Sequence, residues 1–421
     1  MYIPIIIDPC SFYKTRYLWE YLKYLYHCKE NQWPIISTEY FIDYRENIPY
    51  SNVYEEEFYN VHQYKILNEA EESSVLRYVI PNFIFEDLEK ELGSKLAVSL
   101  YLLANRYRPL ERELTKILKR IEKDTKRKIK GFMNWNTHFK SVYYLGKKNK
   151  NVVITNEFAI RFPDYRPTAY FCYDEIYSHD EIMNRYWDFQ KSKRNLGVEL
   201  FSRKELLGLF LQASKLFYLT ESSQLEKYEI GIAGCHPLIS TFFVKSQYTD
   251  LELIQDVRNV YSEEDILFRK HPGDEPYQAF YTVKNRDESQ SAIEFILKCK
   301  RITAQGSNIL LEAMLWGKMV YSRDVSPYTK WCESSLENKI SPIVEEDFLN
   351  YVLLCYLVPY ELICDKEYLK WRETNPNEKE LFWYHLRFYL KQENLDESIL
   401  YLARNNRYKK ILKERRKDNE V

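Results

Sequence analysis

The chain has 421 residues but only ten glycines, and it lacks the short motifs that define several large enzyme classes. It contains no Walker loop, no G-x-G-x-x-G, no H-E-x-x-H and no G-x-S-x-G. These absences argue against P-loop and dinucleotide binding, zinc proteolysis and α/β-hydrolase catalysis. No D-x-D follows a predicted strand, so we expect no metal in the site. The protein's own cations, hydroxyls and helix dipoles would then have to neutralise the phosphate of any bound nucleotide.

Net charge, long apolar runs and paired cysteines are also missing. The 61 basic and 62 acidic side chains nearly cancel, so we expect no nucleic-acid partner. No apolar run approaches the roughly 18 to 20 residues of a membrane span. The opening residues 1–8 lack the basic region of a signal peptide and are better explained as a buried strand. The eight cysteines are scattered without C-x-x-C spacing, which favours reduced thiols. We therefore expect a cytoplasmic protein, at most peripheral to the inner face of a membrane.

Short apolar runs alternate with helical patterns over most of the chain. Strands are predicted at residues 3–8, 79–84, 131–135, 152–155, 216–219, 238–242, 266–269, 301–304 and 319–322. Helices are predicted between them, among them residues 139–147, 225–233, 292–299 and 309–315. This alternation predicts an α/β fold with parallel sheets covered by helices.

The length of the chain predicts two α/β domains. We place the first at residues 1–245 and the second at 246–345. Only helices are expected in the remaining segment, residues 346–421, which ends in a basic tail. That tail is either a docking site for a membrane or a partner, or simply a solvated end.

Half of the glycines fall between residues 231 and 317, around two predicted strand ends with unusual polar residues. Ligands of open α/β sheets bind beyond the carboxyl ends of the strands. The first strand end carries Arg269, Lys270, His271 and Pro272. The second carries Gly306, Ser307 and Asn308, followed by a helix with Glu312. Together they predict a phosphate site made of an imidazole, a hydroxyl and a helix N-terminus. The alternative is an ordinary turn and an ordinary helix cap.

Carboxylates follow two further predicted strands and are candidate catalytic groups. Glu221 lies after the strand predicted at 216–219, and Glu229 lies in the helix predicted after it. Glu157 and His138 lie at neighbouring strand ends, where a carboxylate can deprotonate an acceptor hydroxyl. The alternative for Glu157 is an ion pair with Arg161 or Arg166, and for Glu229 a solvated helix face.

The two phosphate motifs resemble those of bacterial transferases that use CMP-activated acidic sugars. Lys270-His271-Pro272 and Gly306-Ser307-Asn308 are similar to the His-Pro and Ser motifs of sialyltransferases and Kdo transferases. Residues 131–141, 156–158, 165–171 and 220–237 resemble the retaining β-Kdo transferases of surface polysaccharide assembly. The resemblance spans roughly 131–322. It implies a GT-B-like fold of two Rossmann-type domains, with His271 and Ser307 holding the CMP phosphate.

The same resemblance implies the remaining roles. Glu221 or Glu157 would capture or assist the sugar, with His138 beside them. An Asp is expected near the position of Glu221, so the chain departs from the pattern there. Arg161, Arg166 and Glu229 would contact the sugar. The two arginines could pair with the carboxylate that Kdo carries.

We therefore expect transfer of Kdo from CMP-Kdo to a bacterial lipopolysaccharide or capsule glycan, with no cofactor. The expected partners are the sugar nucleotide and a glycan or glycolipid acceptor. Two alternatives stay open: a GT-B transferase that uses a UDP- or GDP-sugar, and a non-catalytic scaffold of a polysaccharide assembly complex.

Overall fold

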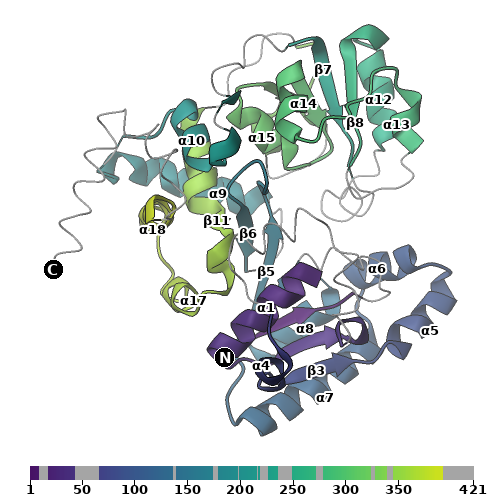
Figure 1. Ribbon diagram of the computed structural model, residues 1–421, viewed down its shortest axis with the longest axis vertical. Coiled ribbons are helices and arrows are strands. Elements are labelled where there is room, and N and C mark those ends of the chain that lie inside the picture. The colour runs from purple at the N-terminus through teal and green to yellow at the C-terminus, as the bar shows by residue number, and fades with distance from the viewer. Residues whose placement is uncertain are drawn as a thin grey trace. The chain divides into compact units, whose positions relative to one another are not determined.

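A computed structural model describes most of the chain. The described residues are 1–8, 18–42, 66–135, 139–173, 179–197, 199–215, 217–218, 226–235, 249–271, 278–323, 328–338 and 345–391. They form two compact units (Figure 1). The first unit comprises residues 1–158, 169–176 and 361–374, and the second comprises 159–168, 177–360 and 375–421.

The first unit is built on a mostly parallel sheet. Its strands are β1 (Tyr2–Ile6), β2 (Ile35–Thr38), β3 (Arg77–Ile80), β4 (Gly131–Trp135), β5 (Val152–Phe158) and β6 (Thr168–Cys172). With the short strand β11 (Val358–Pro359) next to β6, the order is β11-β6-β5-β4-β1-β2-β3. Strands β1 to β5 are parallel, and β6 runs antiparallel to β5. The five parallel strands are almost entirely buried, as expected of a sheet covered on both faces.

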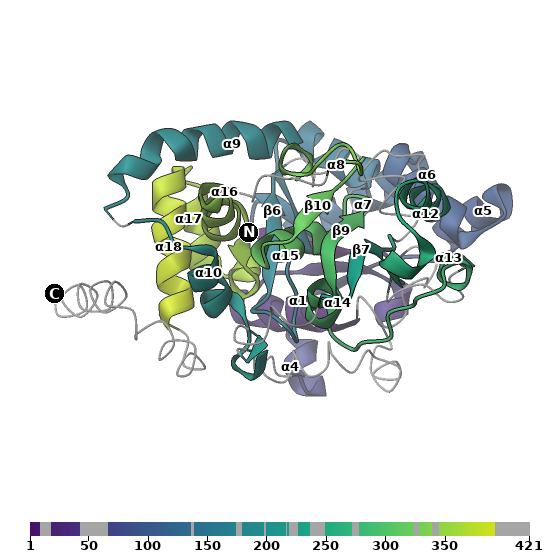
Figure 2. The ribbon, with the colours of Figure 1, turned by 90° about the horizontal axis from the view of Figure 1, so that it is seen from above.

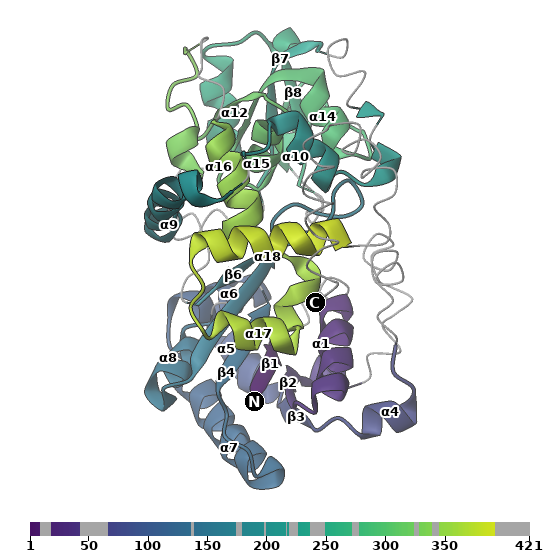
Figure 3. The same cartoon turned by 90° about the vertical axis from the view of Figure 1, so that its left-hand side faces the viewer.

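Helices cover both faces of this sheet. They are α1 (Leu18–Asn31), α4 (Glu69–Ser73), α5 (Phe83–Leu92), α6 (Lys95–Ala104), α7 (Arg108–Thr125), α8 (Lys140–Asn149) and α17 (Lys366–Arg372), with the 3₁₀ turn η1 (Glu39–Phe41). Helix α1 lies on one side of the strands, and α7 and α8 lie on the other (Figure 3). The charged stretch predicted as a helix forms α7, which buries a stripe of leucines and isoleucines at helical spacing.

The second unit contains a smaller, fully parallel sheet. Its strands are β7 (Tyr228–Ala233), β8 (Ile266–Arg269), β9 (Cys299–Ala304) and β10 (Met319–Tyr321), in the order β10-β9-β7-β8. Its helices include α12 (Asp250–Arg258), α13 (Gln278–Thr282), α14 (Ala292–Lys298) and α15 (Ile309–Leu315). Figure 2 shows β7, β9 and β10 beside α14 and α15.

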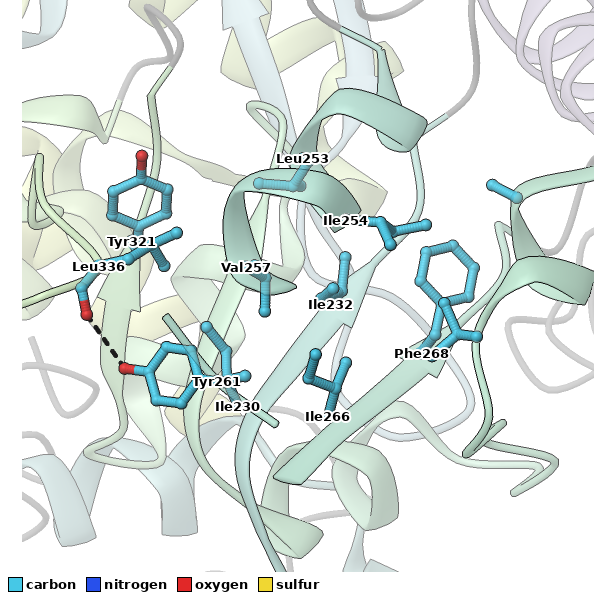
Figure 4. Packing of buried hydrophobic residues seen from close by; sticks show 12 residues of the cluster. Ile230, Ile232, Leu253, Ile254, Val257, Tyr261, Ile266, Phe268, Tyr321 and Leu336 are labelled. Atoms are coloured by element: carbon cyan, nitrogen blue, oxygen red, sulfur yellow. Dashed lines mark hydrogen bonds between the residues drawn. The ribbon is translucent and has the colours of Figure 1, made fainter. Parts of the chain in front are cut away.

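Helix α12 closes one face of this second sheet. Leu253, Ile254 and Val257 of the helix pack against isoleucines of β7 and β8 (Figure 4). The Tyr261 hydroxyl donates to the carbonyl of Leu336 at 3.1 Å and closes the end of the cluster. This packing fixes β7 and β8, and with them the loops that follow both strands.

The rest of the second unit is mainly helical. It includes α9 (His179–Ser192), α10 (Arg203–Phe210), α16 (Glu346–Tyr351), the π-helical turn η8 (Val352–Tyr356) and α18 (Glu378–Lys391). It also holds the 3₁₀ turns η3 (Lys193–Asn195), η4 (Ala213–Lys215), η6 (Glu263–Asp265) and η7 (Thr329–Trp331). The turn η9 (Tyr360–Cys364) begins at its boundary with the first unit, and β11 (Val358–Pro359) precedes that turn. The expected α/β class, with two Rossmann-type sheets and a helical C-terminal segment, is confirmed.

Several predicted elements need correction. The helix predicted at 225–233 is wrong, because residues 228–233 form strand β7. This strand belongs to the second sheet, although a boundary at 245 would leave it in the first domain. Residues 217–218 are not in a strand, and the strand predicted at 238–242 lies outside the described residues. The segment after 345 holds the short β11 as well as helices.

Two global expectations can be compared with the described residues. Within them, no helix is both long enough and apolar enough to cross a bilayer. The seven cysteines that are described carry free thiols, and all but Cys332 are buried. The basic C-terminal tail lies outside the described part of the chain.

Candidate functional site

The second sheet reverses its strand order between β7 and β9. The chain moves outward from β7 to β8 and, on the other side, from β9 to β10. Open parallel sheets bind ligands in the crevice beside such a switch point, at the carboxyl ends of the strands. The loops there begin at Gly234 after β7 and at Gln305 after β9. The Asp250 carboxylate accepts from the amide of Cys235 at 2.9 Å and anchors the first loop to α12.

The loop after β9 carries the predicted Gly306-Ser307-Asn308 motif. Gly306 has a φ of 55°, a left-handed value that favours glycine over other residues. The Ser307 hydroxyl accepts from the amide of Ile309 at 3.4 Å. Gln305 is buried, and its side-chain nitrogen has no hydrogen-bond partner. The structure thus places the predicted motif at the switch point and adds a buried amide donor that the sequence did not single out.

The loop after β8 begins with the predicted basic residues. Strands β8 and β9 both pair with β7, so their ends are about 10 Å apart. His271 is half-buried at the end of the described part of this loop, and Pro272 lies beyond it. The strand ends therefore support a phosphate site that uses groups from both loops.

Arg269 is held rigidly at the base of this loop. Its guanidinium contacts the carboxylate of Asp287 at 2.5 Å and the carbonyl of Ser289 at 2.9 Å. The Asp287 carboxylate is fully buried and also accepts from the amine of Lys298 at 2.9 Å. Sequence reasoning missed Asp287, because it lies 18 residues from Arg269. An arginine fixed in this way carries its positive charge at a defined place beside the predicted phosphate site.

Glu312 lies in the first turn of α15, inside a cluster of charged residues. Burial and the nearby Asp164 carboxylate raise the pKa of Glu312 to about 8, against the opposing effect of Arg161 and Arg269. The nearby Tyr165 hydroxyl also acts to lower the pKa of Glu312. The structure therefore brings together three predicted residues, Arg161, Arg269 and Glu312, from three separate segments. With this raised pKa the Glu312 carboxyl group favours its protonated form, and the positive charges of Arg161 and Arg269 are set against the carboxylates of Asp164 and Asp287.

The first sheet also reverses its strand order, between β1 and β4. Thr38, Asn134 and Asn156 are buried near the carboxyl ends of three parallel strands. Glu157 lies on β5, is 3% exposed, and faces Tyr170 of β6 in the strand register. Strand alternation puts it on the opposite face from its neighbour Asn156. Glu157 is thus a buried carboxyl group near a ligand-binding edge, as a catalytic group requires.

Helix α1 adds buried polar residues that the sequence analysis did not single out. Lys23 is completely buried, and this burial lowers its pKa to about 8, against the opposing influence of the Cys364 thiol, Glu20 and Glu361. Among the described residues, the buried Tyr24 hydroxyl and both polar side-chain atoms of Asn156 have no hydrogen-bond partner. In the sequence, this cluster is indicated by the charged pair Glu20 and Lys23, which lies within an otherwise apolar stripe of the predicted helix.

Not all predicted residues gather at these edges. Arg166 is buried and donates to the carbonyl of Tyr389 at 3.2 Å, a contact that favours a structural role. Glu229 lies near the amino end of β7, not in a helix, and pairs with Lys300. The structure does not bring Glu229 to the ligand-binding edge. Glu221 and His138 lie outside the described residues, as does Pro272.

Among the described residues, no group of three or more histidine, cysteine, aspartate and glutamate side chains is arranged to hold a metal ion. The groups available at the second sheet are instead a guanidinium pair, an imidazole, a hydroxyl and a neutral carboxyl group. Such a set can hold an anionic ligand through charge and hydrogen bonds.

Comparison with solved structures gives weak likenesses. The Thermosulfurimonas dismutans KpsC β-Kdo 2,7 transferase is 15% identical with a TM-score of 0.37, over 63% of this chain and 90% of that one. The β-Kdo 2,4 transferase of the same KpsC is 11% identical with a TM-score of 0.31, over 52% and 78%. The Methanocaldococcus jannaschii UDP-GlcNAc 2-epimerase is 14% identical with a TM-score of 0.34, over 78% and 85%. These scores are too low to assign an activity.

Comparison with curated protein sequences finds no match. Residues 6–181 match the model of the glycosyltransferase 99 family N-terminal domain. The matched segment covers less than half of the chain and includes strands β2 to β6 but only the last residue of β1. On this match the chain is a glycosyltransferase whose residues 6–181 are similar to the N-terminal domain of the glycosyltransferase 99 family.

Proposed function

We propose that this glycosyltransferase transfers Kdo from CMP-Kdo to a bacterial surface glycan. The second unit binds the donor, with His271 and Ser307 on the phosphate and Asn308 and Glu312 beside it. The observation that carries the proposal is the position of Gly306, next to the switch point of a parallel sheet. A ligand there meets the Ser307 loop on one side of β7 and the His271 loop on the other.

Charge at the site supports a donor with an anionic sugar. Arg269 is fixed by Asp287, and Arg161 lies near enough to Glu312 to influence its pKa. Departure of CMP leaves negative charge on phosphate, which fixed cations and hydrogen-bond donors stabilise. The carboxylate of Kdo adds a second negative charge that a guanidinium can pair. A neutral hexose would use only the first of these features.

A carboxylate, Glu221 or Glu157, captures the sugar or assists its transfer. The position of Glu157, buried towards the carboxyl end of β5, supports a role as acid or base. The reaction proceeds without a metal and, through a covalent carboxylate adduct, with retention of configuration. The acceptor is a lipopolysaccharide or capsule glycan at the inner face of the membrane.

Calorimetric titration of the full chain with CMP, UDP and GDP tests the donor. We expect CMP to bind most tightly, and His271→Ala and Ser307→Ala each to weaken it about tenfold or more. Ser262→Ala is the matched control, since its exposed hydroxyl donates to the Asp265 carboxylate at 2.7 Å. Equal affinity of wild type and His271→Ala for CMP would refute the phosphate role of His271.

The open alternatives are separate outcomes of the same titration. Preference for UDP or GDP would assign another sugar to the same fold. Absence of binding by all three nucleotides would favour a non-catalytic scaffold. Release of free Kdo from CMP-Kdo, measured with wild type and Glu221→Gln, distinguishes an enzyme from a scaffold that merely binds the donor.

A further inference from the structure

The amino-terminal edge of the first sheet, opposite the edge where ligands of parallel sheets bind, carries a dense group of cations. Residues 119–130 and 147–151, which precede β4 and β5, contain ten lysines and arginines but only two acidic residues. The whole chain has a formal net charge of −1, so the remainder of the chain is negatively charged. A local excess of one sign attracts a partner of the opposite sign, so this edge of the sheet is suited to an anionic partner.

A hollow of about 680 Å³ opens among these cations, and we call it the basic hollow. It lies between the carboxyl-terminal half of α7, the loop that leads into β4 and the end of α8. Four cations line it, Lys119, Lys126, Arg127 and Lys128, with the single carboxylate of Glu122. The rest of its described lining is amide, hydroxyl and aliphatic, without an aromatic ring. Its volume is in the range of sites that hold small ligands or head groups.

The loop that carries three of these cations, residues 126–130, is fixed by the strands beside it. The ammonium group of Met1 donates to the carbonyl of Lys128 at 3.0 Å, and the amide of Lys130 donates to the carbonyl of Met1 at 2.8 Å. On the other side, the amide of Val152 donates to the carbonyl of Lys130 at 3.0 Å. The backbone of the basic hollow is therefore ordered before any ligand binds, which lowers the entropy cost of binding.

The negative charge nearby does not neutralise the basic hollow. Among the described residues, Lys119, Lys126 and Lys128 form no ion pair. Helices α7 and α8 both end here, and their two carboxyl ends together carry about one unit of negative charge. With Glu122 and Asp124, this charge offsets about three of the ten cations. The remaining excess is available to an anionic ligand.

Exposed aliphatic side chains on the same edge favour a membrane over a nucleic acid. Val152 at the start of β5 is 39% exposed, and Leu76, just before β3, is 46% exposed. Aliphatic groups next to cations suit the boundary between head groups and acyl chains of a bilayer. Proteins that bind single-stranded nucleic acid stack its bases on aromatic side chains, and the described lining of the basic hollow has none.

We propose that the basic hollow binds the phosphate of an anionic phospholipid, and that the amino-terminal edge of the first sheet docks the first unit on an anionic membrane. This surface differs from the donor site and from the basic C-terminal tail, and it requires no step of the proposed reaction. The docked unit directs its opposite edge, with Asn134 and Asn156, away from the lipid. A membrane-bound acceptor therefore reaches that edge with the distal end of its glycan.

Co-sedimentation of the full chain with vesicles tests the proposal. The vesicles contain about one third phosphatidylglycerol in phosphatidylcholine, and pure phosphatidylcholine is the neutral comparison. We expect binding to the anionic vesicles alone, with release at about 1 M salt, where the screening length falls to about 3 Å. Each lysine near an anionic surface contributes about fivefold to partitioning, so the triple variant Lys119→Gln, Lys126→Gln, Lys128→Gln should bind about a hundredfold more weakly.

One control keeps the net charge of the triple variant. Lys90→Gln, Lys191→Gln and Lys284→Gln together remove the same charge at exposed ion pairs outside the basic hollow. This second triple variant should bind vesicles as wild type does. Equal thermal midpoints of both triple variants and wild type confirm that all three proteins are folded.

A second control compares two lysines one turn apart on α7. Lys119 lines the basic hollow, whereas Lys116 pairs with Glu113 at 2.9 Å and is not part of the lining. Lys119→Gln should weaken vesicle binding about fivefold, and Lys116→Gln less than about twofold. An equal loss in the two variants overturns the role of the basic hollow.

The other outcomes also decide the matter. Failure of wild type to bind anionic vesicles overturns the proposal, and so does binding of inorganic pyrophosphate or RNA without binding of vesicles. Equal vesicle binding by wild type and the Lys119, Lys126, Lys128 triple variant assigns docking to another surface and overturns the proposal as well. Titration with CMP reports on the donor site separately, so failure of the proposed function and failure of this inference are distinguishable.

Discussion

Replacing Asp287 with Asn removes one negative charge from the base of the predicted phosphate site. The Asp287 carboxylate is fully buried and contacts two cations, Arg269 at 2.5 Å and Lys298 at 2.9 Å. It also accepts from the hydroxyl of Ser289 at 2.7 Å. The amide of Asp287 donates to the carbonyl of Phe268 at 2.8 Å, so its segment runs alongside β8. The substitution keeps the size and shape of the side chain and changes its charge.

The magnitude follows from the two lost charge-assisted hydrogen bonds. Each contributes about 1.5 to 3 kcal/mol when it is buried. The side chains of Arg269 and Lys298 are 20% and 33% exposed, so water recovers part of this energy. We expect a loss of about 2 to 4 kcal/mol in the free energy of unfolding of the second unit. For a domain of this size, that lowers the midpoint of thermal unfolding by roughly 5 to 15 °C.

Thermal unfolding and CMP titration of the same variant check the reasoning. Asp256→Asn is the matched control, because the pair of Asp256 with Arg323 lies on the surface of the same unit. A surface pair contributes about 0 to 1 kcal/mol, so that variant should unfold close to wild type. We also expect Asp287→Asn to bind CMP more weakly, since Arg269 loses its fixed position. If the two variants unfold at the same temperature, the structural role given to Asp287 is wrong.

Three further predictions concern packing, buried hydrogen bonds and pH. In Gly231→Ala, the new Cβ would lie 2.7 Å from the sulfur of Cys299. This overpacking should lower the free energy of unfolding in urea by about 1 to 3 kcal/mol. Unchanged stability would contradict the close packing of β7 on β9. Asn350→Ala should lower the free energy of unfolding by about 2 to 4 kcal/mol, because the Asn350 side chain bonds both the amide and the carbonyl of Phe201. A fall in the midpoint of thermal unfolding of less than about 2 °C would argue against this. Wild type should lose stability as pH rises from 5 to 8, since Glu312 has a pKa of about 8 in the folded protein and 4.5 in the unfolded chain. Glu312→Gln should lose less stability over the same range. If the urea midpoints of the two proteins fall equally with pH, this reasoning is refuted.

The alternation of strands and helices could be predicted from local patterns. Buried strands such as β8 and β9 are short apolar runs that end in polar residues, and both were predicted close to their observed bounds. Residues 225–233 were predicted as a helix that ends at Gly234, whereas residues 228–233 form strand β7. Gly231 between Ile230 and Ile232 is the feature that should have indicated a strand, since the period there is two residues.

The Gly306-Ser307-Asn308 motif lies at the switch point because it directly follows strand β9, and His271 lies after β8 on the other side of β7. The groups that control Glu312 could not be found in the same way. Tyr165 lies 151 residues from Trp316, and Asp164 lies 127 residues from Ser291. No local pattern connects such pairs, because folding of distant segments brings them together. Asp287 escaped notice for a similar reason, since a single acidic residue in a loop has no distinguishing neighbours.

The chain leaves one unit for the other after Phe158, Thr168, Ile176, Tyr360 and Thr374. A fragment that ends near residue 181 therefore lacks α17, which returns late in the sequence to the first unit. Arg372 of that helix lies over the ring of Phe171, with its guanidinium carbon 4.7 Å from the ring centroid, and Tyr368 packs against the same ring. Shortening the gene to the segment that matches the family would uncover this aromatic side of β6. Expression of the first unit alone would require residues 361–374 to be joined to it by an engineered linker.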